Sequence, residues 1–166
     1  MVFDEIGDRA SPGGNLCNAS PAADSIPALI AAAATVTIIG PKGKREAKVE
    51  EICTGVGQNS LAKGEVVTSI SFPKRPARSS DAYLRFTPRT EMDIAVVGAG
   101  VNLTLDDKGV CSAARVALGA VNVTPILVPA AAAALIGSAV DDAAIARMGA
   151  ACSAAGRCRG TPGILA

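Results

Sequence analysis

Three strands are predicted from the hydrophobic and polar pattern in the first half of the chain. Residues Thr35–Ile39 are all β-branched, and the turn sequence GPKG connects them to an alternating run, Lys44–Val49. This pattern predicts a β-hairpin. Glu65–Phe72 alternates as well, which predicts a half-buried strand with Val67 on one face and Ile70 on the other.

The second half is predicted to form two strands and then two helices. Alternation begins at Ile94 or Val96 and continues to Leu105, and after a turn at DDKG a second strand covers Val110–Val121. An alanine-rich helix is predicted at Pro129–Ile136, with Gly137 as its end. Asp141 or Asp142 caps a last helix, Ala143–Ala155, which places three residues on one face: Ile145, Met148 and Cys152.

The segments between these elements are less regular. Glu50–Leu61 contains two glycines and is predicted to be a short helix or turn that leads into a loop. Pro73–Ser80 has two prolines, three basic residues and two serines, which is typical of a linker. We place a subdomain boundary there. The whole pattern predicts an α+β protein whose second half is an antiparallel sheet with helices on one side.

Composition excludes several classes of function. The 166 residues include no histidine, so the commonest general base and metal ligand are missing, and we predict neither a catalytic residue nor a metal site. Aromatic residues make up 2% and the net charge is +1, which argues against a nucleic-acid partner. The five cysteines form no C-x-x-C pair, so we expect reduced thiols and a cytoplasmic location.

One uncharged stretch, Val116–Val140, is long enough to cross a bilayer, which needs about 20 apolar residues. It contains Pro125, Pro129 and two glycines, and much of the rest is alanine. We therefore interpret it as a buried strand, a turn and a helix, and predict no membrane span.

The stretch Gly13–Leu29, GGNLCNASPAADSIPAL, holds the densest group of candidate ligand contacts. Adjacent glycines let backbone amides approach a ligand, and Asn15, Asn18 and Ser20 add polar side chains. Asp24 stands at the N-cap position of a helix that has Pro27 in its first turn and runs through Ala34. Two interpretations remain open from the residues alone: a cradle for a phosphate or cofactor, or a tight turn before a capped helix.

A second glycine motif, IAVVGAG at 94–100, resembles the start of a dinucleotide-binding fingerprint. Leu103 replaces its third glycine, alternation continues after Gly100, and a turn stands where a helix is required. We therefore predict a strand in which the glycines permit close packing or a bulge.

Four motifs occur in order along the chain: SPGGNLCNASPAADSIPAL, LAKGEVVTSISFP, YLRFTPRTEMDIA and ARVALGAVNVTP. Together they resemble the FAD-binding medium subunit of the molybdenum hydroxylases, the family of carbon monoxide dehydrogenase and xanthine dehydrogenase. The resemblance implies that residues 1–74 are the second lobe of a PCMH-like FAD-binding domain, with antiparallel strands and helices. Residues 75–166 would form an α+β domain like the C-terminal domain of the CO dehydrogenase flavoprotein.

The resemblance also implies a function. In this family the flavin subunit takes electrons that leave a molybdopterin centre through two 2Fe–2S clusters, and passes them to NAD or another acceptor. The expected partners are a molybdopterin-binding large subunit and a 2Fe–2S small subunit in a hetero-oligomer. Cofactor-binding residues carried over by motif are Gly13, Gly14, Asn15, Ser20 and Asp24 near the ribityl and pyrophosphate groups.

Arg85 matches a basic residue that approaches the isoalloxazine ring in relatives, where a cation favours the negative charge of the reduced ring. Arg89 and Asp93 match the same motif and could either support the ligand or form a structural ion pair. Pro12 stands where the family has an amide donor, so one ligand hydrogen bond is lost. The family's N-terminal lobe has no counterpart in the sequence, which leaves a second hypothesis: a truncated module that folds and associates but binds no FAD alone.

Overall fold

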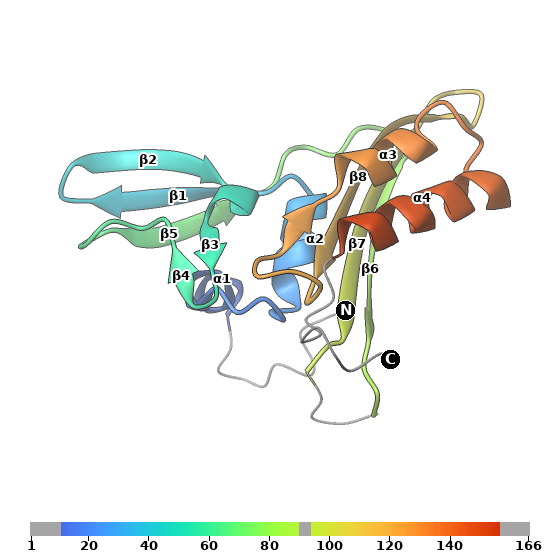
Figure 1. The fold of residues 1–166 in the computed structure, drawn as a ribbon. Helices are drawn as coiled ribbons and strands as arrows, with labels where there is room; N and C mark the ends of the chain where they lie inside the picture. The colour runs from blue at the N-terminus through green and yellow to red at the C-terminus, as the bar shows by residue number, and fades with distance from the viewer. Residues whose placement is uncertain (1–10, 90–93, 157–166) are drawn as a thin grey trace.

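The computed structural model describes residues 11–89 and 94–156 of the chain. Two antiparallel sheets lie on either side of one helix, α2, as Figure 1 shows. The predicted α+β class and the antiparallel sheets with helices are confirmed. No helix within the described ranges is long and apolar enough to cross a bilayer.

The first half contains a three-stranded sheet in the order β2-β1-β5 and a small sheet of β3 and β4. The predicted hairpin is confirmed, since β1 pairs antiparallel with β2 from Thr35↔Lys48 to Gly40↔Gly43. The small sheet lies in the stretch that we predicted as a helix or turn and a loop, so only its 3-10 turn agrees. The elements are α1 (Pro12–Asn18), α2 (Ser25–Ala31), β1 (Thr35–Gly40), β2 (Gly43–Lys48), η1 (Val49–Glu51), β3 (Cys53–Gly55), β4 (Gln58–Asn59) and β5 (Val66–Ser71).

Strand β5 departs from the predicted alternation. Its pairing with β1 shifts between Thr37↔Ser69 and Ile38↔Val67, so Thr68 is an extra residue in a β-bulge. The bulge turns Val67 and Ile70 toward the same hydrophobic core, although simple alternation placed them on opposite faces. That prediction was wrong because a bulge adds one residue to the period of two.

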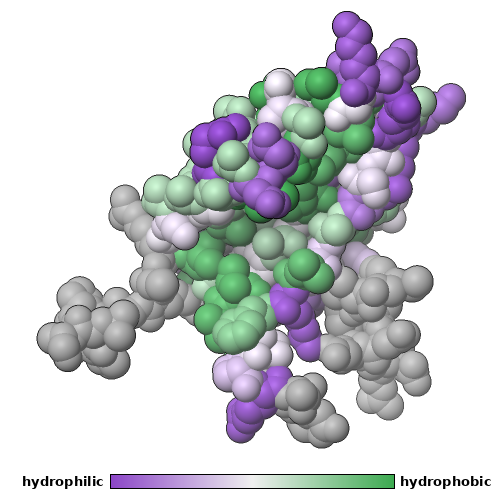
Figure 2. Space-filling view, turned by 90° about the vertical axis from the view of Figure 1, so that its right-hand side faces the viewer, coloured by the Kyte–Doolittle hydropathy of each residue, from purple (hydrophilic) through white to green (hydrophobic). Residues whose placement is uncertain are grey.

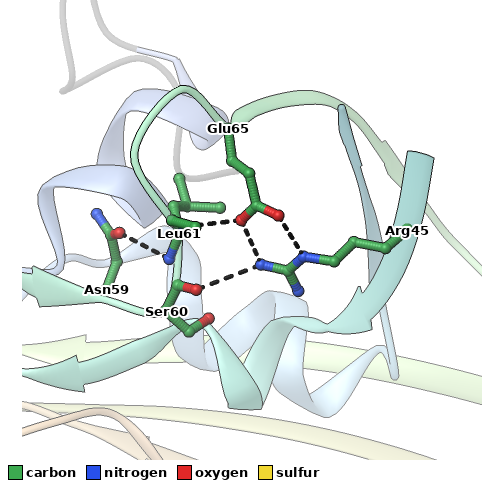
Figure 3. A network of polar contacts seen from close by, with 6 residues as sticks. Arg45, Asn59, Ser60, Leu61 and Glu65 are labelled. Carbon is green, nitrogen blue, oxygen red and sulfur yellow. Dashed lines mark hydrogen bonds and ion pairs between the residues drawn. The ribbon is translucent and has the colours of Figure 1, made fainter. Parts of the chain in front are cut away.

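A polar network fixes the loop that precedes β5 (Figure 3). Arg45 of β2 donates two hydrogen bonds to the Glu65 carboxylate, at 2.9 and 2.7 Å, and a third to the Ser60 carbonyl. The Ala62 amide donates to the same carboxylate at 2.8 Å. These contacts hold the pKa of Glu65 far below its usual value, at about 2, chiefly through the Arg45 hydrogen bond.

The second half forms a four-stranded sheet in the order β6-β7-β8-β9. The predicted long hairpin is confirmed as β7 and β8, but the edge strand β6 was not predicted. It occupies residues that the sequence pattern left unassigned, and Ser79 and Ser80, placed in the linker, belong to it. The elements are β6 (Ser79–Phe86), β7 (Val97–Leu105), β8 (Cys111–Gly119), β9 (Ile126–Leu127), α3 (Pro129–Leu135) and α4 (Asp142–Ala155).

Both predicted helices of this half are present. The Asp141 side chain caps α4 by accepting a 2.8 Å hydrogen bond from the Ala144 amide. Met148 and Cys152 of α4 pack on the core as expected, but Ile145 is 45% exposed. The helix turns Ala144 inward in its place. At the start of α4, the small side chain of Ala144 therefore contacts the core, where the spacing of hydrophobic residues predicted Ile145.

Helix α2 links the two halves. Its residues pack with β1 in the first core, and Ala117 of β8 belongs to that same core. Val116 and Leu118, on the opposite face of β8, lie in the second core with α3 and α4. A Cβ at Gly100 would lie 2.6 Å from the Pro27 carbonyl oxygen, so only glycine lets α2 pack so closely on β7. The predicted close packing at this glycine is confirmed.

Figure 2 shows hydrophobic surface between hydrophilic groups on one side of the molecule. Two of the exposed hydrophobic side chains belong to the edge strand β6, Leu84 at 76% and Phe86 at 59%. Their neighbours on the same strand, Tyr83 and Arg85, point to the other face of the sheet, toward α2.

Candidate functional site

Gly13 and Gly14 lie in the first turn of α1, not in a tight turn as one of the two interpretations held. Ser11 caps this helix, with its hydroxyl accepting a 3.0 Å hydrogen bond from the Gly14 amide. Pro12 follows at the first helical position, where its missing N–H costs little. No described atom lies within 4 Å of a Cβ built at Gly13, so that residue faces open space.

Asn15 connects α1 to the start of α2. Its side-chain amide donates to the Ser25 hydroxyl at 3.2 Å, and Ser25 is buried beside Asp24. Ser20 lies in the turn between the helices, where its carbonyl accepts the Ala23 amide. Gly13 and Gly14 have no side chain, and the hydrogen bonds given for the described residues join neither the two glycines nor Ser20 to Asp24 or Arg85. These hydrogen bonds therefore do not bring the five positions into one cluster.

Asp24 precedes α2 but does not cap it with its side chain. One carboxylate oxygen instead accepts a 2.7 Å hydrogen bond from Arg85 Nη1, and the other accepts a 3.1 Å bond from the Tyr83 hydroxyl. The predicted N-cap position of Asp24 is confirmed, but its side chain does not cap the helix, because these two partners, about sixty residues later on β6, occupy the carboxylate. The same contacts bring two predicted site residues, Asp24 and Arg85, together.

The pair is partly shielded from water, with side-chain exposures of 16% for Asp24 and 27% for Arg85. Burial raises the pKa of the Asp24 carboxyl, against the opposing effect of the Tyr83 hydrogen bond. Burial and the adjacent Asp24 carboxylate raise the pKa of the Tyr83 phenol. Tyr83 therefore remains protonated and donates to Asp24 across the range in which proteins work.

Tyr83 was missed by the sequence analysis. It stands two residues before Arg85 on a strand, so both side chains point to the same face, and it is the only tyrosine in the chain. Its ring lies over Gly98, where a Cβ would meet the hydroxyl at 2.5 Å. If residues Ser79–Phe86 had been recognised as a strand, the spacing of two would have paired Tyr83 with Arg85.

A cavity of about 400 Å³ opens next to this cluster. Tyr83 and Ser25 line it, together with Pro12 of α1, Leu29 of α2 and Phe72 after β5. Most of its wall is hydrophobic. The cavity thus touches each of these groups through one residue: Pro12 at the start of α1, Ser25 of the Asn15–Ser25 contact and Tyr83 of the Asp24–Tyr83–Arg85 cluster. Among the described residues, Asp24 and Arg85 lie behind Tyr83 and do not themselves line the cavity.

The glycines of the 94–100 motif are not at a ligand site. Gly98 is covered by Tyr83 and Gly100 by α2, as described above. Arg89 is a described residue with at least one interaction of its own, whereas Asp93 lies outside the described residues. The choice between ligand support and a structural ion pair at these two positions therefore stays a prediction.

Two family models match the chain. Residues 4–75 match the FAD binding domain in molybdopterin dehydrogenase, and residues 82–162 match the CO dehydrogenase flavoprotein C-terminal domain. Among curated relatives, the nicotinate dehydrogenase FAD-subunit of Eubacterium barkeri is 30% identical over 125 residues, 74% of this chain and 42% of that protein. A putative xanthine dehydrogenase FAD-binding subunit of Escherichia coli is 32% identical over 123 residues, with the same coverages.

Solved structures of carbon monoxide dehydrogenases match the chain as well. The CO dehydrogenase from Oligotropha carboxidovorans matches with a TM-score of 0.83 and 28% identity, over 90% of this chain and 52% of that one. The carbon monoxide dehydrogenase from Hydrogenophaga pseudoflava matches with a TM-score of 0.85 and 28% identity, over 92% and 53%. The chain thus spans about half the length of the relatives it matches. With both halves matched in sequence and fold, the chain belongs to the family of FAD-binding subunits of the molybdenum hydroxylases.

Proposed function

We propose that this chain forms one wall of the FAD site in an electron-transfer subunit of a molybdenum hydroxylase. The observation that carries this proposal is the cluster of Asp24, Tyr83 and Arg85 beside the 400 Å³ cavity, because it joins residues from both matched family domains at one ligand-sized space. The partners would be a molybdopterin-binding and a 2Fe–2S polypeptide, and the acceptor NAD or another oxidant.

The residues present fit one side of an FAD molecule. No described atom lies within 4 Å of a Cβ built at Gly13, so a cofactor group could approach the backbone of α1 there and a larger side chain would occupy that space. The cavity is near the lower end of ligand pockets, about 300–1,000 Å³, so it suits part of a dinucleotide and not all of it. Its hydrophobic wall and single tyrosine are suited to a flat aromatic group.

The chain's own groups would bind and orient the cofactor. FAD, when bound, supplies reversible electron transfer at its ring. Asp24 fixes the Arg85 guanidinium in place at 2.7 Å and offsets its charge, and Tyr83 holds the other carboxylate oxygen. The ion pair with Asp24 places the positive charge of Arg85 next to Tyr83 of the cavity wall without leaving an unpaired, half-buried cation. Asn15 and Ser25 position α1 against α2, and so place Gly13 relative to the cavity.

A second candidate is a module of the same subunit that folds and associates but does not hold FAD alone. The specific observation in its favour is coverage, since the relatives are about twice as long as the matched segment. Each charge-assisted phosphate contact that is absent weakens binding by about 1.5–3 kcal/mol. Several such losses would reduce affinity by orders of magnitude.

The test is flavin content in a reconstituted complex. The full chain would be purified together with the part of the Eubacterium barkeri FAD-subunit that it does not match, and the bound flavin measured by absorbance. We expect near-stoichiometric FAD with the unmodified chain and very little with Gly13→Val, since that side chain enters the open space in front of α1. Gly149→Ala is the matched control, because a Cβ there also meets nothing within 4 Å, but on α4. A complex without FAD, or one in which Gly13→Val retains it, would contradict the proposal.

A further inference from the structure

A second cavity, of about 270 Å³, borders both halves of the chain. Its wall is formed by the end of α2, by the connecting segment between β5 and β6 (residues 72–78), and by the second sheet. Among the described residues, the wall of the first cavity has one charged side chain, that of Asp81. The wall of the second cavity has four charged side chains and one side-chain amide: Lys74, Arg75, Asp81, Arg115 and Asn102.

A row of polar side chains crosses the second sheet at this cavity. Asp81 of β6 pairs with Asn102 of β7, and Asn102 pairs in turn with Arg115 of β8. Directly paired residues of neighbouring strands point to the same face of a sheet. That face is the one on which α2 lies, since Gly100, two residues before Asn102, contacts α2. The sheet therefore presents adjacent polar groups to the cavity, at the point where α2 ends.

Several hydrogen-bond donors of this wall are not used by the fold. Arg115 donates through Nε and Nη2 to the Ile30 carbonyl and through Nη2 to the Glu50 carboxylate, which leaves Nη1 without a partner in the described part of the chain. Within residues 11–89 and 94–156, the Asn102 amide and the Lys74 ammonium also make no side-chain hydrogen bond. These groups are free to bind a ligand that accepts hydrogen bonds.

The charge of the wall favours an anion. Three cationic side chains line the cavity, whereas Asp81 supplies one carboxylate and is already paired with Arg75. Glu50, which is not on the wall, offsets part of the charge of Arg115. The donors come from three directions: the connecting segment, β7 and β8. A tetrahedral oxyanion has acceptor oxygens in several directions, whereas the two oxygens of a carboxylate lie in one plane, so the arrangement suits a phosphate group better.

We propose that this cavity binds a phosphate group, with Asn102 and Arg115 of the sheet on one side and Lys74 of the connecting segment on the other. This site goes beyond the flavin wall proposed above and does not depend on it. A bound phosphate would link the connecting segment to the second sheet and so stabilise the contact between the halves. Ala31, Ala32 and Phe72 are shared with the hydrophobic first cavity, which leaves room for the apolar group of a phosphate monoester.

The experiment measures the melting temperature of the full chain, without flavin, against the concentration of inorganic phosphate, with sodium chloride added to hold the ionic strength constant. We expect a rise that saturates, because a ligand that binds only the folded chain stabilises it by mass action at one site. Phosphate also stabilises proteins by exclusion from their surface, but that effect does not depend on the wall of one cavity. The double variant Lys74→Met/Asn102→Leu should raise the phosphate concentration at half-saturation at least about tenfold.

Lys63→Met is the matched control, because it removes the same charge from the exposed loop before β5, and it should respond to phosphate like the unmodified chain. Lys74→Glu changes only the exposed connecting segment, so it tests the site even if the double variant does not fold, and it should abolish the saturable rise.

Phenyl phosphate distinguishes the two sources of the group. Tighter binding than that of inorganic phosphate would identify a monoester as the ligand, and equal or weaker binding would identify the free ion; both results support the site. The proposal is overturned if phosphate raises the melting temperature without saturation, or if Lys74→Glu and Lys63→Met respond to phosphate equally.

Discussion

The two halves of the molecule bury their hydrophobic residues in different ways. The second half covers one face of its sheet with its own helices, α3 and α4, and every residue of that core comes from the second half. The first half includes Ala117 and Leu127 of the second half in its core, and its helix α2 packs between both sheets. The core under α3 and α4 is therefore formed within its own half, whereas the core around α2 includes residues of both halves. This dependence matters because the candidate site takes Asp24 from one half and Tyr83 and Arg85 from the other.

Among contacts between the two halves, the one at Gly100 should give the largest loss of stability when it is disrupted. A Cβ there would lie 2.6 Å from the Pro27 carbonyl oxygen, so Gly100→Ala must push α2 away from β7. We expect a loss of about 1–3 kcal/mol in the free energy of unfolding, which denaturant titration would measure. Gly149→Ala, in the interior of α4 with open space around it, should leave stability unchanged or raise it. Equal effects of the two substitutions would mean that α2 does not depend on this contact.

A second contact between the halves is made by Arg115 of β8. Its guanidinium donates to the Ile30 carbonyl at the end of α2 and to the Glu50 carboxylate at 3.1 Å. Arg115→Met leaves both acceptors without this donor, and we expect a loss of about 1–3 kcal/mol. Arg78→Met is the matched control, because Arg78 also donates to one backbone carbonyl, that of Asp106, and to one carboxylate, that of Asp107, but at the exposed surface, where an ion pair contributes about 0–1 kcal/mol. If Arg78→Met lowered the free energy of unfolding as much as Arg115→Met, the Arg115 contact would not be a specific link between the halves.

Acid should weaken the Arg45–Glu65 network of the first half. The pKa of Glu65 is about 2 in the folded chain and 4.5 in its ordinary state, so its ionised form stabilises the fold at neutral pH. That contribution is complete above pH 4.5 and is lost as the pH falls toward 2. We expect Glu65→Gln to lower the melting temperature at neutral pH and to flatten its acid dependence. A fall in stability with acid that is as steep in Glu65→Gln as in the unmodified chain would assign the effect to other groups.

How well the sequence predicted each half follows from the range of the contacts involved. The β7–β8 hairpin and α4 were predicted because alternation, the DDKG turn and the Asp141 cap are local signals. The bulge at Thr68 could not be predicted, since it exists only in pairing with β1. The role of Asp24 was assigned to capping because the competing Arg85 and Tyr83 lie far along the chain. Gly13 and Gly14 favoured a turn in isolation, but the Ser11 cap stabilises a helix there.

The candidate site residues were selected by resemblance, and the structure joins only some of them. Asp24 contacts Arg85, and Asn15 contacts Ser25 beside Asp24, because α2 packs against both α1 and β6. The assignment to cofactor binding stays a prediction for all six residues: Gly13, Gly14, Asn15, Ser20, Asp24 and Arg85. The predicted boundary between residues 74 and 75 also stays a prediction, since α2, which precedes the boundary, packs against strands that follow it.

The flavin content of the isolated chain, measured by its absorbance spectrum as purified and after incubation with FAD, tests the central claim most directly. If this chain is one wall of a site that another polypeptide segment completes, it purifies colourless and shows no saturable binding of FAD. A yellow preparation with near-stoichiometric FAD would contradict the account, because the residues present would then suffice for the whole site.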